Sequence, residues 1–380
     1  MSDYSGEPGT PREDLGTVRI VGTGLLGTSI GLALGGGAKV LLDDPSPTAL
    51  ALARDVGAGV VDDGGAAPDL VVVAAPPDVT AKVVAEQLHT HPHATVTDVA
   101  SVKLGVVEQL AQRGADLRRY VGGHPMAGRE RSGPVASRAD LFMGRPWVIC
   151  PAPESEPDRV EQVRRLVTAL GAAAVTMGPA EHDAAVALVS HVPQVAASLV
   201  AARLTRAPDP AVSLAGQGVR DVTRIAGSDP TLWAQILAAN AGPVGEVLRE
   251  LRADLDDVIE ALAALGGETS GPRSWPAREA VGARGTLARL VAAGNDGRDR
   301  IPGKHGAAPT TYAVVTALLP DSPGQLARLF SDIGEAGINV EEFSLEHAPG
   351  MPVGLAEVSV LPAVRGALEE ALVTRGWHVV

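Results

Sequence analysis

The sequence has 380 residues, of which 45% are hydrophobic and only 3% aromatic, and its formal net charge is -13. A chain of this length usually forms more than one hydrophobic core, so two or three domains are expected. The acidic balance argues against a nucleic-acid partner, which would need clustered Lys and Arg. A single cysteine, Cys150, rules out an intramolecular disulfide and suits a reducing compartment.

The N-terminal segment is polar and lacks the apolar stretch of a signal peptide or a membrane anchor. We expect residues 1–15 to be a disordered tail. No apolar run elsewhere is expected to reach the length of a transmembrane helix. The sequence therefore predicts a cytoplasmic protein without a membrane partner.

Short apolar runs alternate with helical patterns from residue 16 to residue 178. The unbroken apolar character of runs such as DLVVVAAPP predicts a parallel sheet covered on both faces. This is the pattern of a doubly wound, Rossmann-type α/β domain. The expected strands are VRIVG, KVLLD, DLVVVAAPP, ATVTDVAS, RYVGGHP, PWVICP and GAAAVTM.

Residues 179–300 are expected to form an all-helical middle domain, whose first helix should be kinked at Pro193. A later segment carries an apolar stripe at helical spacing that fits an internal core or a homodimer interface. The stripe comprises Val244, Val247, Leu248, Leu251, Leu255, Val258 and Leu262. The region 266–310 is rich in Gly, Pro and Arg, with a short helix near 277–293, and we assign 301–310 as the linker. Residues 311–380 then follow a βαββαβ order, which predicts a small two-layer domain.

A glycine pattern, GTGLLG, follows the first strand and opens a helix. Gly22, Gly24 and Gly27 permit a tight turn and a close backbone approach, and Leu25 and Leu26 would begin the helix that faces a pyrophosphate. The pattern alone is weak, and its glycines would otherwise serve only helix–strand packing. Its place between strand and helix favours dinucleotide binding.

An acidic residue, Asp43, ends the second strand at the position that binds a ribose diol in such folds. Asp44 adjoins it, and no Lys or Arg follows immediately to receive a phosphate, which favours NAD over NADP. Ala75 and Pro76 end a parallel strand where the backbone would pass the nicotinamide side.

Two polar residues follow neighbouring strand candidates. Ser101 lies in DVASVK and His124 in GGHPMAG. Because ligands of doubly wound sheets lie beyond the carboxyl ends of the strands, both side chains can reach one crevice. Pro125 restricts His124 to an extended conformation.

Five segments in this order and spacing resemble the prephenate dehydrogenase family of tyrosine biosynthesis, which includes arogenate dehydrogenases. They are GTGLLGTSI, DVASVK, GGHPMAGRERSG, HDAAVALVSHVPQ and DVTRIAGSDPTLW. The resemblance spans about residues 18–305, and IPGKHG with the C-terminal unit extends it to forms that carry an ACT domain. It implies NAD-dependent oxidative decarboxylation of prephenate to 4-hydroxyphenylpyruvate, without a metal.

The resemblance also implies roles for single residues. His124 would accept a hydrogen bond from the substrate hydroxyl, beside Ser101, and a neutral imidazole suits this task near neutral pH. Arg224 matches an arginine that binds substrate carboxylate. The other positions that line or gate the pocket are Glu130, Ser190, Ser228 and Trp233, and His191 is either a further pocket residue or a core histidine.

One departure from the family leaves the substrate open. Gln194 stands where many prephenate-type members have a second histidine. A neutral amide replaces a group that can carry positive charge, and arogenate has an amino group where prephenate has a keto group. Arogenate is therefore the alternative substrate.

Two other reactivities compete with this interpretation. A β-hydroxyacid or imine reductase also pairs a nucleotide domain with a helical one, but would typically need a lysine between residues 179 and 303, where none occurs. A non-catalytic sensor of NAD and amino acids is the more distant alternative. For the remaining histidines we expect ordinary roles: His182 as a core histidine, and HTHPH, residues 89–93, as a surface loop rather than a metal site.

The C-terminal segment PDSPGQL and GINVEEF resemble ACT domains, which bind amino acids between paired modules. Feedback by tyrosine is the implied function. A module that only dimerises is the alternative, because one fold serves many functions.

Overall fold

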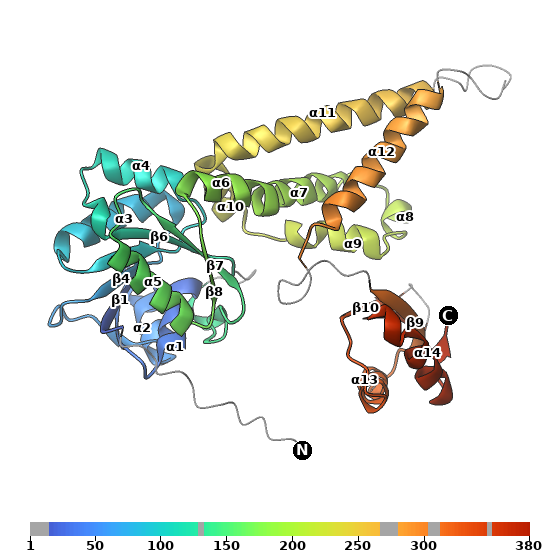
Figure 1. Ribbon diagram of the computed structural model, residues 1–380, viewed down its shortest axis with the longest axis horizontal. Helices are drawn as coiled ribbons and strands as arrows, with labels where there is room; N and C mark the ends of the chain where they lie inside the picture. Colours follow the sequence, from blue (N-terminus) through green and yellow to red (C-terminus); the bar gives the residue numbers. More distant parts are fainter. Residues whose placement is uncertain (1–14, 128–132, 267–279, 303–311, 348–351) are drawn as a thin grey trace. The chain divides into compact units, whose positions relative to one another are not determined.

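The computed structural model describes residues 15–127, 133–266, 280–302, 312–347 and 352–380. The chain forms two compact units, one of residues 1–206 and 223–250 and the other of residues 207–222 and 251–380. Figure 1 shows the elements in chain order, with the strands and their covering helices.

The first unit contains a sheet of eight strands in the order β3-β2-β1-β4-β5-β6-β7-β8. Its strands are β1 (Thr17–Val21), β2 (Lys39–Asp43), β3 (Val60–Val61), β4 (Leu70–Val73), β5 (Thr95–Asp98), β6 (Tyr120–Pro125), β7 (Pro146–Pro151) and β8 (Ala173–Thr176). The chain order reverses beside β1, which pairs in parallel with both β2 and β4. This confirms the doubly wound arrangement.

The helices of this sheet are α1 (Leu25–Leu34), α2 (Pro47–Asp55), α3 (Pro77–Thr90), α4 (Leu104–Gln112) and α5 (Pro157–Ala169). Short 3₁₀ turns occur at Leu117–Arg119 and Pro134–Ala136. In Figure 1 the sheet lies between these helices.

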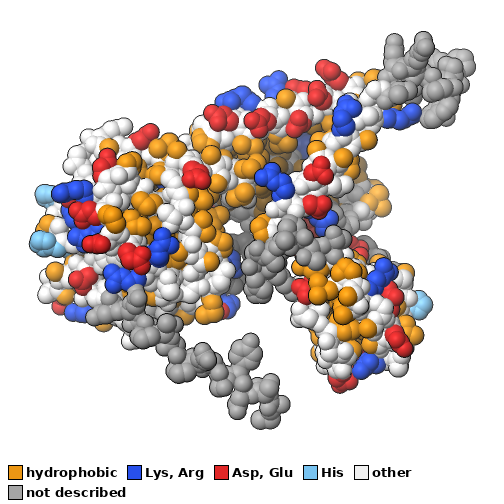
Figure 2. Space-filling view, viewed as in Figure 1, with side chains coloured by type: hydrophobic (Ala, Val, Ile, Leu, Met, Phe, Trp, Pro, Cys, Tyr) orange, Lys and Arg blue, Asp and Glu red, His pale blue; other side chains and the backbone are white. Residues whose placement is uncertain are grey.

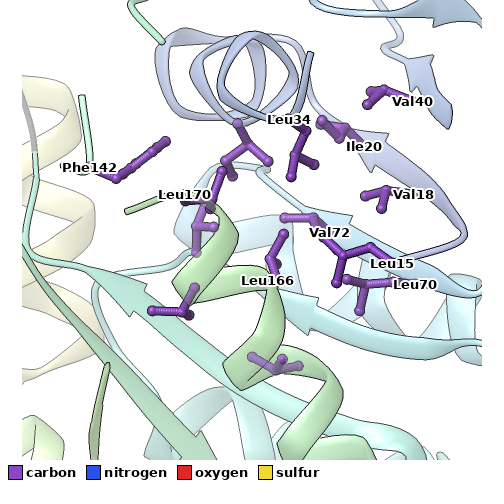
Figure 3. Close-up of a cluster of buried hydrophobic side chains, with 14 of the residues drawn as sticks. Leu15, Val18, Ile20, Leu34, Val40, Leu70, Val72, Phe142, Leu166 and Leu170 are labelled. Carbon is purple, nitrogen blue, oxygen red and sulfur yellow. The ribbon is translucent and has the colours of Figure 1, made fainter. Parts of the chain in front are cut away.

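Hydrophobic cores lie on both faces of the sheet. In β4, Leu70 and Val72 face one core, and Val71 and Val73 face the other. Figure 3 shows the first core, where Leu70 and Val72 meet Leu166 of α5. The second core is closed by side chains of α3 and α4. Burial on both faces explains why β4 has no alternation of polar residues.

One pair of strands departs from the expected parallel sheet. β6 and β7 are antiparallel, with His124 opposite Val148. Parallel neighbours need a long crossover, usually a helix. The described residues between these strands contain only the 3₁₀ turn at Pro134–Ala136, so β7 returns antiparallel.

The helical part of the first unit begins with α6 (Pro179–Val186), a π-helical turn (Ala187–His191) and α7 (Val192–Leu204). The expected kink is this π turn, and Pro193 lies in the first turn of α7, where its missing N–H costs little. A 3₁₀ turn (Arg224–Ala226) and α10 (Pro230–Ala239) follow later in the chain.

The continuous stretch Pro179–Leu204 has 26 residues and a mean hydropathy of 1.6, which is long and apolar enough to cross a membrane by length and composition alone. The expectation that no run reaches this length is therefore wrong. The stretch is weak evidence for a span, because core helices of soluble proteins have the same properties. It also carries the buried polar residues His182, Asp183 and His191.

The remaining helices are α8 (Asp209–Val212), α9 (Gln217–Thr223), α11 (Ala241–Gly266) and α12 (Ala280–Arg298). The helical character expected for the middle region is confirmed. In α11, Val244 is buried, whereas Leu251, Leu255 and Leu262 are exposed. Figure 2 shows acidic and basic side chains along α11. An ion pair of this helix joins Arg252 and Asp256 at 3.5 Å.

The C-terminal residues of the second unit form a separate sheet in the order β10-β11-β9-β12. Its elements are β9 (Ala313–Pro320), α13 (Gln325–Glu335), β10 (Glu342–His347), β11 (Val353–Val360), a 3₁₀ turn (Pro362–Val364), α14 (Arg365–Thr374) and β12 (His378–Val379). Leu329 of α13 and Leu368 of α14 share one core with the inner side chains of β9 and β11. The expected βαββαβ order is therefore present.

Candidate active site

The glycine loop lies between β1 and α1, at the carboxyl edge of the sheet. Gly22 has a φ of 101°, and a Cβ there would overlap the carbonyl oxygen of Ala74. A Cβ at Gly27 would overlap the carbonyl oxygen of Gly22. Gly24 has no heavy atom within 4 Å of an added Cβ, so the loop is open where α1 begins with Leu25. This close-packed turn under an open helix N-terminus fits a pyrophosphate.

The two acidic residues after β2 have different partners. The carboxylate of Asp44 accepts hydrogen bonds from the backbone N–H of Thr23 at 2.6 Å and from that of Ser46 at 2.7 Å. Asp44 therefore holds the glycine loop. Asp43 is paired with Arg19 at 2.9 Å through one oxygen, and its side chain remains 43% exposed. Of the two, Asp43 is the residue placed to receive a ribose.

The segment after β4 passes beside this loop, because the backbone N–H of Ala74 donates to the carbonyl of Val21 at 2.7 Å. Ala75 and Pro76 come next, and the Thr80 hydroxyl donates to the Pro76 carbonyl at 2.9 Å, which fixes the start of α3. The predicted cofactor residues of both strands therefore lie together at one edge of the sheet.

The loop that carries Ser101 is anchored by Asp98, the last residue of β5. Its carboxylate accepts a hydrogen bond from the backbone N–H of Ala100 at 2.8 Å and from the Tyr120 hydroxyl at 2.6 Å, and it pairs with Lys103. All three side chains are fully buried. Burial, followed by the nearby Asp98, raises the pKa of Tyr120 well above its ordinary value. The buried Asp98–Lys103 ion pair thus anchors the loop that carries Ser101.

His124 is the next-to-last residue of strand β6, which lies beside β5 in the sheet. A Cβ on Gly123 would come within 2.6 Å of the Asp98 carbonyl oxygen, so only glycine permits this approach of the two strand ends. The His124 ring is half-buried, and its Nδ1 lies 2.8 Å from Nε2 of His182. The glycine pair before the histidine therefore serves packing, and the histidine itself faces the helical part.

His182 and Asp183 of α6 complete this connection. Nδ1 of His182 lies 2.7 Å from the Asp183 carboxylate. The same carboxylate accepts hydrogen bonds from the backbone N–H groups of Lys103 at 2.8 Å and Leu104 at 2.9 Å, at the start of α4. His182 is a buried histidine, as expected, but its partner is His124 rather than an unrelated core group.

The π-helical turn brings His191 to the same cluster. Asn240, which is buried at the end of α10, donates through Nδ2 to the Asp183 carbonyl at 2.8 Å and lies 3.0 Å from Nδ1 of His191. The Trp233 ring stands edge-on to the His191 ring, with centroids 6.0 Å apart. His124, His191 and Trp233, which come from separate segments, are therefore linked through His182, Asp183 and Asn240.

A second polar pair involves Gln194 of α7. Its amide oxygen accepts a hydrogen bond from the Ser228 hydroxyl at 3.4 Å, and its amide nitrogen donates to Ser198 at 3.4 Å. Ser190 is half-buried and Arg224 is exposed on its 3₁₀ turn. In the described ranges, no hydrogen bond joins Ser101, Ser190 or Arg224 to His124. Glu130 lies outside the described residues.

Sequence reasoning missed Asp183, Asn240 and the Asp98–Lys103 pair. The only local signal was the dipeptide His182-Asp183, which does not reveal that the carboxylate caps a helix 79 residues away. Over the ranges that the structure describes, no group of three His, Cys, Asp or Glu side chains is placed to hold a metal ion.

Two family models match this chain. The nucleotide-binding domain of prephenate dehydrogenase matches residues 33–176, and its dimerization domain matches residues 178–269. A probable prephenate dehydrogenase, NovF of Streptomyces niveus, is 39% identical over 95% of this chain and 98% of its own length. The chain belongs to the prephenate dehydrogenase family. The prephenate dehydrogenase of Bacillus subtilis is 28% identical over 85% of this chain and 86% of its own length.

Solved structures of the family share this fold. A prephenate dehydrogenase from A. aeolicus, in complex with hydroxyphenyl propionate and NAD+, has a TM-score of 0.62 and 27% identity, and covers 74% of this chain and 98% of that one. The arogenate dehydrogenase of Synechocystis has a TM-score of 0.61 and 26% identity, and covers 75% of this chain and 99% of that one. A Rossmann-type domain followed by a helical dimerization domain is thus the family arrangement.

Proposed function

We propose that this chain oxidises prephenate with NAD, with loss of carbon dioxide, to give 4-hydroxyphenylpyruvate. The observation that carries the proposal is His124, held by His182 at the sheet edge that also carries the glycine loop. Burial lowers the pKa of His124 well below its ordinary value of about 6.5, and the nearby His182, Lys103 and His191 lower it further. The imidazole is therefore neutral at pH 7 and can accept a proton.

In the proposed reaction NAD supplies the hydride acceptor when bound in the cradle of Gly22, Gly24 and Gly27. His124 accepts the hydrogen bond of the ring hydroxyl and takes its proton as the C–H bond breaks and the carbonyl forms. The C–C bond to the ring carboxylate breaks, carbon dioxide leaves, and the electron pair of that bond completes the aromatic ring. The ring oxygen, now a phenolate, takes the proton back from His124, which restores the neutral imidazole and gives the hydroxyl group of the product. Ser101 orients the hydroxyl, and Arg224 binds a substrate carboxylate as a bidentate donor.

We assign Asp43 to the ribose diol, supported by its exposure at the end of β2 and by the engagement of Asp44 with the glycine loop. This assignment favours NAD over NADP, because the carboxylate of Asp43 would repel the additional phosphate that NADP carries on this ribose. Leu25, Leu26, Ala75 and Pro76 line the same edge. The remaining proposed pocket residues are Ser190, His191, Trp233 and Glu130.

Arogenate is the second candidate substrate. The observation that favours it is Gln194, a buried neutral amide that already bonds Ser198 and Ser228. The keto group of prephenate would gain no cationic partner from this side chain. An ammonium group on the substrate would meet an amide oxygen rather than a histidine.

For the C-terminal βαββαβ unit we propose an ACT-type regulatory domain that binds tyrosine. The sheet order β10-β11-β9-β12 with both helices in one core supports this fold, and PDSPGQL, which begins at the end of β9, is one of the segments that resemble ACT domains. A purely dimerising module is the alternative. The exposed leucines of α11 and the dimerization domain of the family support a homodimer. A cytoplasmic location stays a prediction from the sequence.

One experiment tests these proposals together. NADH formation is measured with prephenate and with arogenate, each with and without tyrosine. We expect NADH to form when NAD and prephenate are both present. The value of kcat/KM should be higher for prephenate than for arogenate, and tyrosine should lower the rate. No turnover of prephenate would refute the proposed reaction, and a large preference for arogenate would reverse the order of substrates. Calorimetry that gives no heat with tyrosine, phenylalanine or tryptophan would favour the dimerising module.

The pH dependence provides a separate prediction. The groups that face His124 are His182, His191 and Lys103, and burial is the largest cause of its lowered pKa. The active base is the neutral form, so activity is lost only as the pH falls through this lowered pKa. The acid limb of kcat/KM for prephenate should therefore lie below pH of about 6.5. Substrate decay without enzyme is subtracted at each pH, and an acid limb at or above that value would contradict the assignment.

A further inference from the structure

We propose that His182 is a positioning residue that fixes His124 in one tautomer, with hydrogen on Nδ1 and a free lone pair on Nε2. The inference rests on the proposed role of His124 as the proton acceptor. It assigns a task to His182 and Asp183, neither of which was part of the predicted site. The hydrogen bonds of the Asp183 carboxylate determine the direction of the others in this cluster.

Asp183 stands at the end of this series of hydrogen bonds. Two backbone N–H groups, from Lys103 and Leu104, donate to its two oxygens at 2.8 and 2.9 Å. Backbone amides are fixed donors, so both oxygens must act as acceptors toward them. Each oxygen is thus engaged by a backbone donor, and the side chain is buried. Asp183 therefore has only acceptor capacity to offer to His182.

The Asp183 carboxylate determines which nitrogen carries hydrogen in each of the two rings. Nδ1 of His182 lies 2.7 Å from this carboxylate, so it must carry hydrogen and donate. In the neutral ring Nε2 is then an acceptor. Nδ1 of His124 lies 2.8 Å from that Nε2 and must donate to it. Nε2 of a neutral His124 is consequently left with a lone pair, the form needed to take the hydroxyl proton.

Asn240 keeps His191 out of this series of hydrogen bonds. Its Nδ2 donates to the backbone carbonyl of Asp183 and lies 3.0 Å from Nδ1 of His191. His191 is thereby held as an acceptor at Nδ1 and does not compete for the Asp183 carboxylate. His191 also has a pKa lowered by burial, so it adds no full positive charge beside His124 near neutral pH.

The hydrogen-bond chain also supports the reaction. When the hydroxyl proton moves to Nε2 of His124, the ring becomes an imidazolium whose Nδ1–H still points at Nε2 of His182. The negative charge of Asp183, one ring further, stabilises this cation in a buried setting. No proton has to leave Asp183 or His182 for this step, so His182 acts through His124 and need not touch the substrate.

Two substitutions of His182 separate tautomer control from packing. His182→Phe keeps a ring but removes both hydrogen-bonding atoms, whereas His182→Gln carries an acceptor and a donor on one side chain. We expect kcat for prephenate to fall by about 10²-fold or more in H182F and by less than about tenfold in H182Q. The KM for NAD should be unchanged in both. Thermal unfolding of each variant checks that it is folded, and an H182F kcat within about threefold of the parent would overturn the proposal.

The tautomer itself is measured by ¹⁵N NMR of the imidazole nitrogens in the full-length, unmutated chain at neutral pH. The signals of His124, assigned by their loss in His124→Asn, should show a protonated Nδ1 and an unprotonated Nε2. A protonated Nε2 with a bare Nδ1 would overturn the proposal. This measurement needs no substrate. If prephenate is not turned over, the proposed function fails while the tautomer is still determined.

Discussion

Replacing His124 by asparagine is expected to lower kcat for prephenate by about 10²–10⁴-fold, the range that positioned acid–base groups contribute. The amide is close in size to the imidazole and retains a polar group near His182, which lies 2.8 Å from His124 in the parent. It has no basic nitrogen, however, so the hydroxyl proton has no acceptor. The measurement is steady-state NADH formation, with the affinity for NAD determined separately by calorimetry.

The matched control for this variant is His89→Asn. His89 is exposed in the last turn of α3. The surface loop predicted for residues 89–93 is therefore wrong at His89 and Thr90, which are helical. The His89→Asn variant should retain the kinetics of the parent, which excludes a general effect of removing a histidine. Unchanged NADH production in His124→Asn would remove His124 from the reaction.

The second large effect is expected from Gly27→Ala, which should abolish measurable NAD binding and destabilise the first unit. The added Cβ would overlap the carbonyl oxygen of Gly22, a backbone atom that cannot move without the glycine loop. Overpacking of this kind costs about 1–3 kcal/mol and shifts the surrounding backbone. The midpoint of thermal unfolding and the Kd for NAD are measured together.

Gly24→Ala is the matched control, because a Cβ at Gly24 meets no atom within 4 Å and its φ is -72°. We expect its stability to stay within about 0.5 kcal/mol of the parent. Its NAD affinity should still fall, since the pyrophosphate approaches the backbone at this position. Parent-like NAD affinity in Gly27→Ala would show that the loop does not form the cradle.

Much of the nucleotide domain could be predicted from local patterns. The apolar run Leu70–Val73 predicted a strand buried on both faces, and its side chains do alternate between two cores. Gly22 and Gly27 could be recognised because their spacing reflects backbone contacts within a few residues. The antiparallel β7 was not predicted, because strand direction depends on what connects two strands rather than on the strands themselves.

The candidate site was predictable only where a residue belonged to a recognised segment. Ser101 follows β5 and His124 lies near the end of the neighbouring β6, so the sequence could place both at one edge of the sheet. The role of Asp183 could not, since its partners at Lys103 and Leu104 come from a distant helix start. Asn240 carries no local pattern, and its importance arises from the two atoms that it bridges.

The attachment of Asp183 to the start of α4 has a mechanical consequence. A helix whose side chain holds two backbone amides of the nucleotide domain cannot swing away from that domain without breaking both bonds. In terms of rigidity, α6 belongs with the sheet, although it follows the last strand of that sheet in the chain. A hinge that admits substrate would have to lie after α6, and the π turn at Ala187–His191, where regular α-helical bonding is interrupted, is the first place in the chain that offers one.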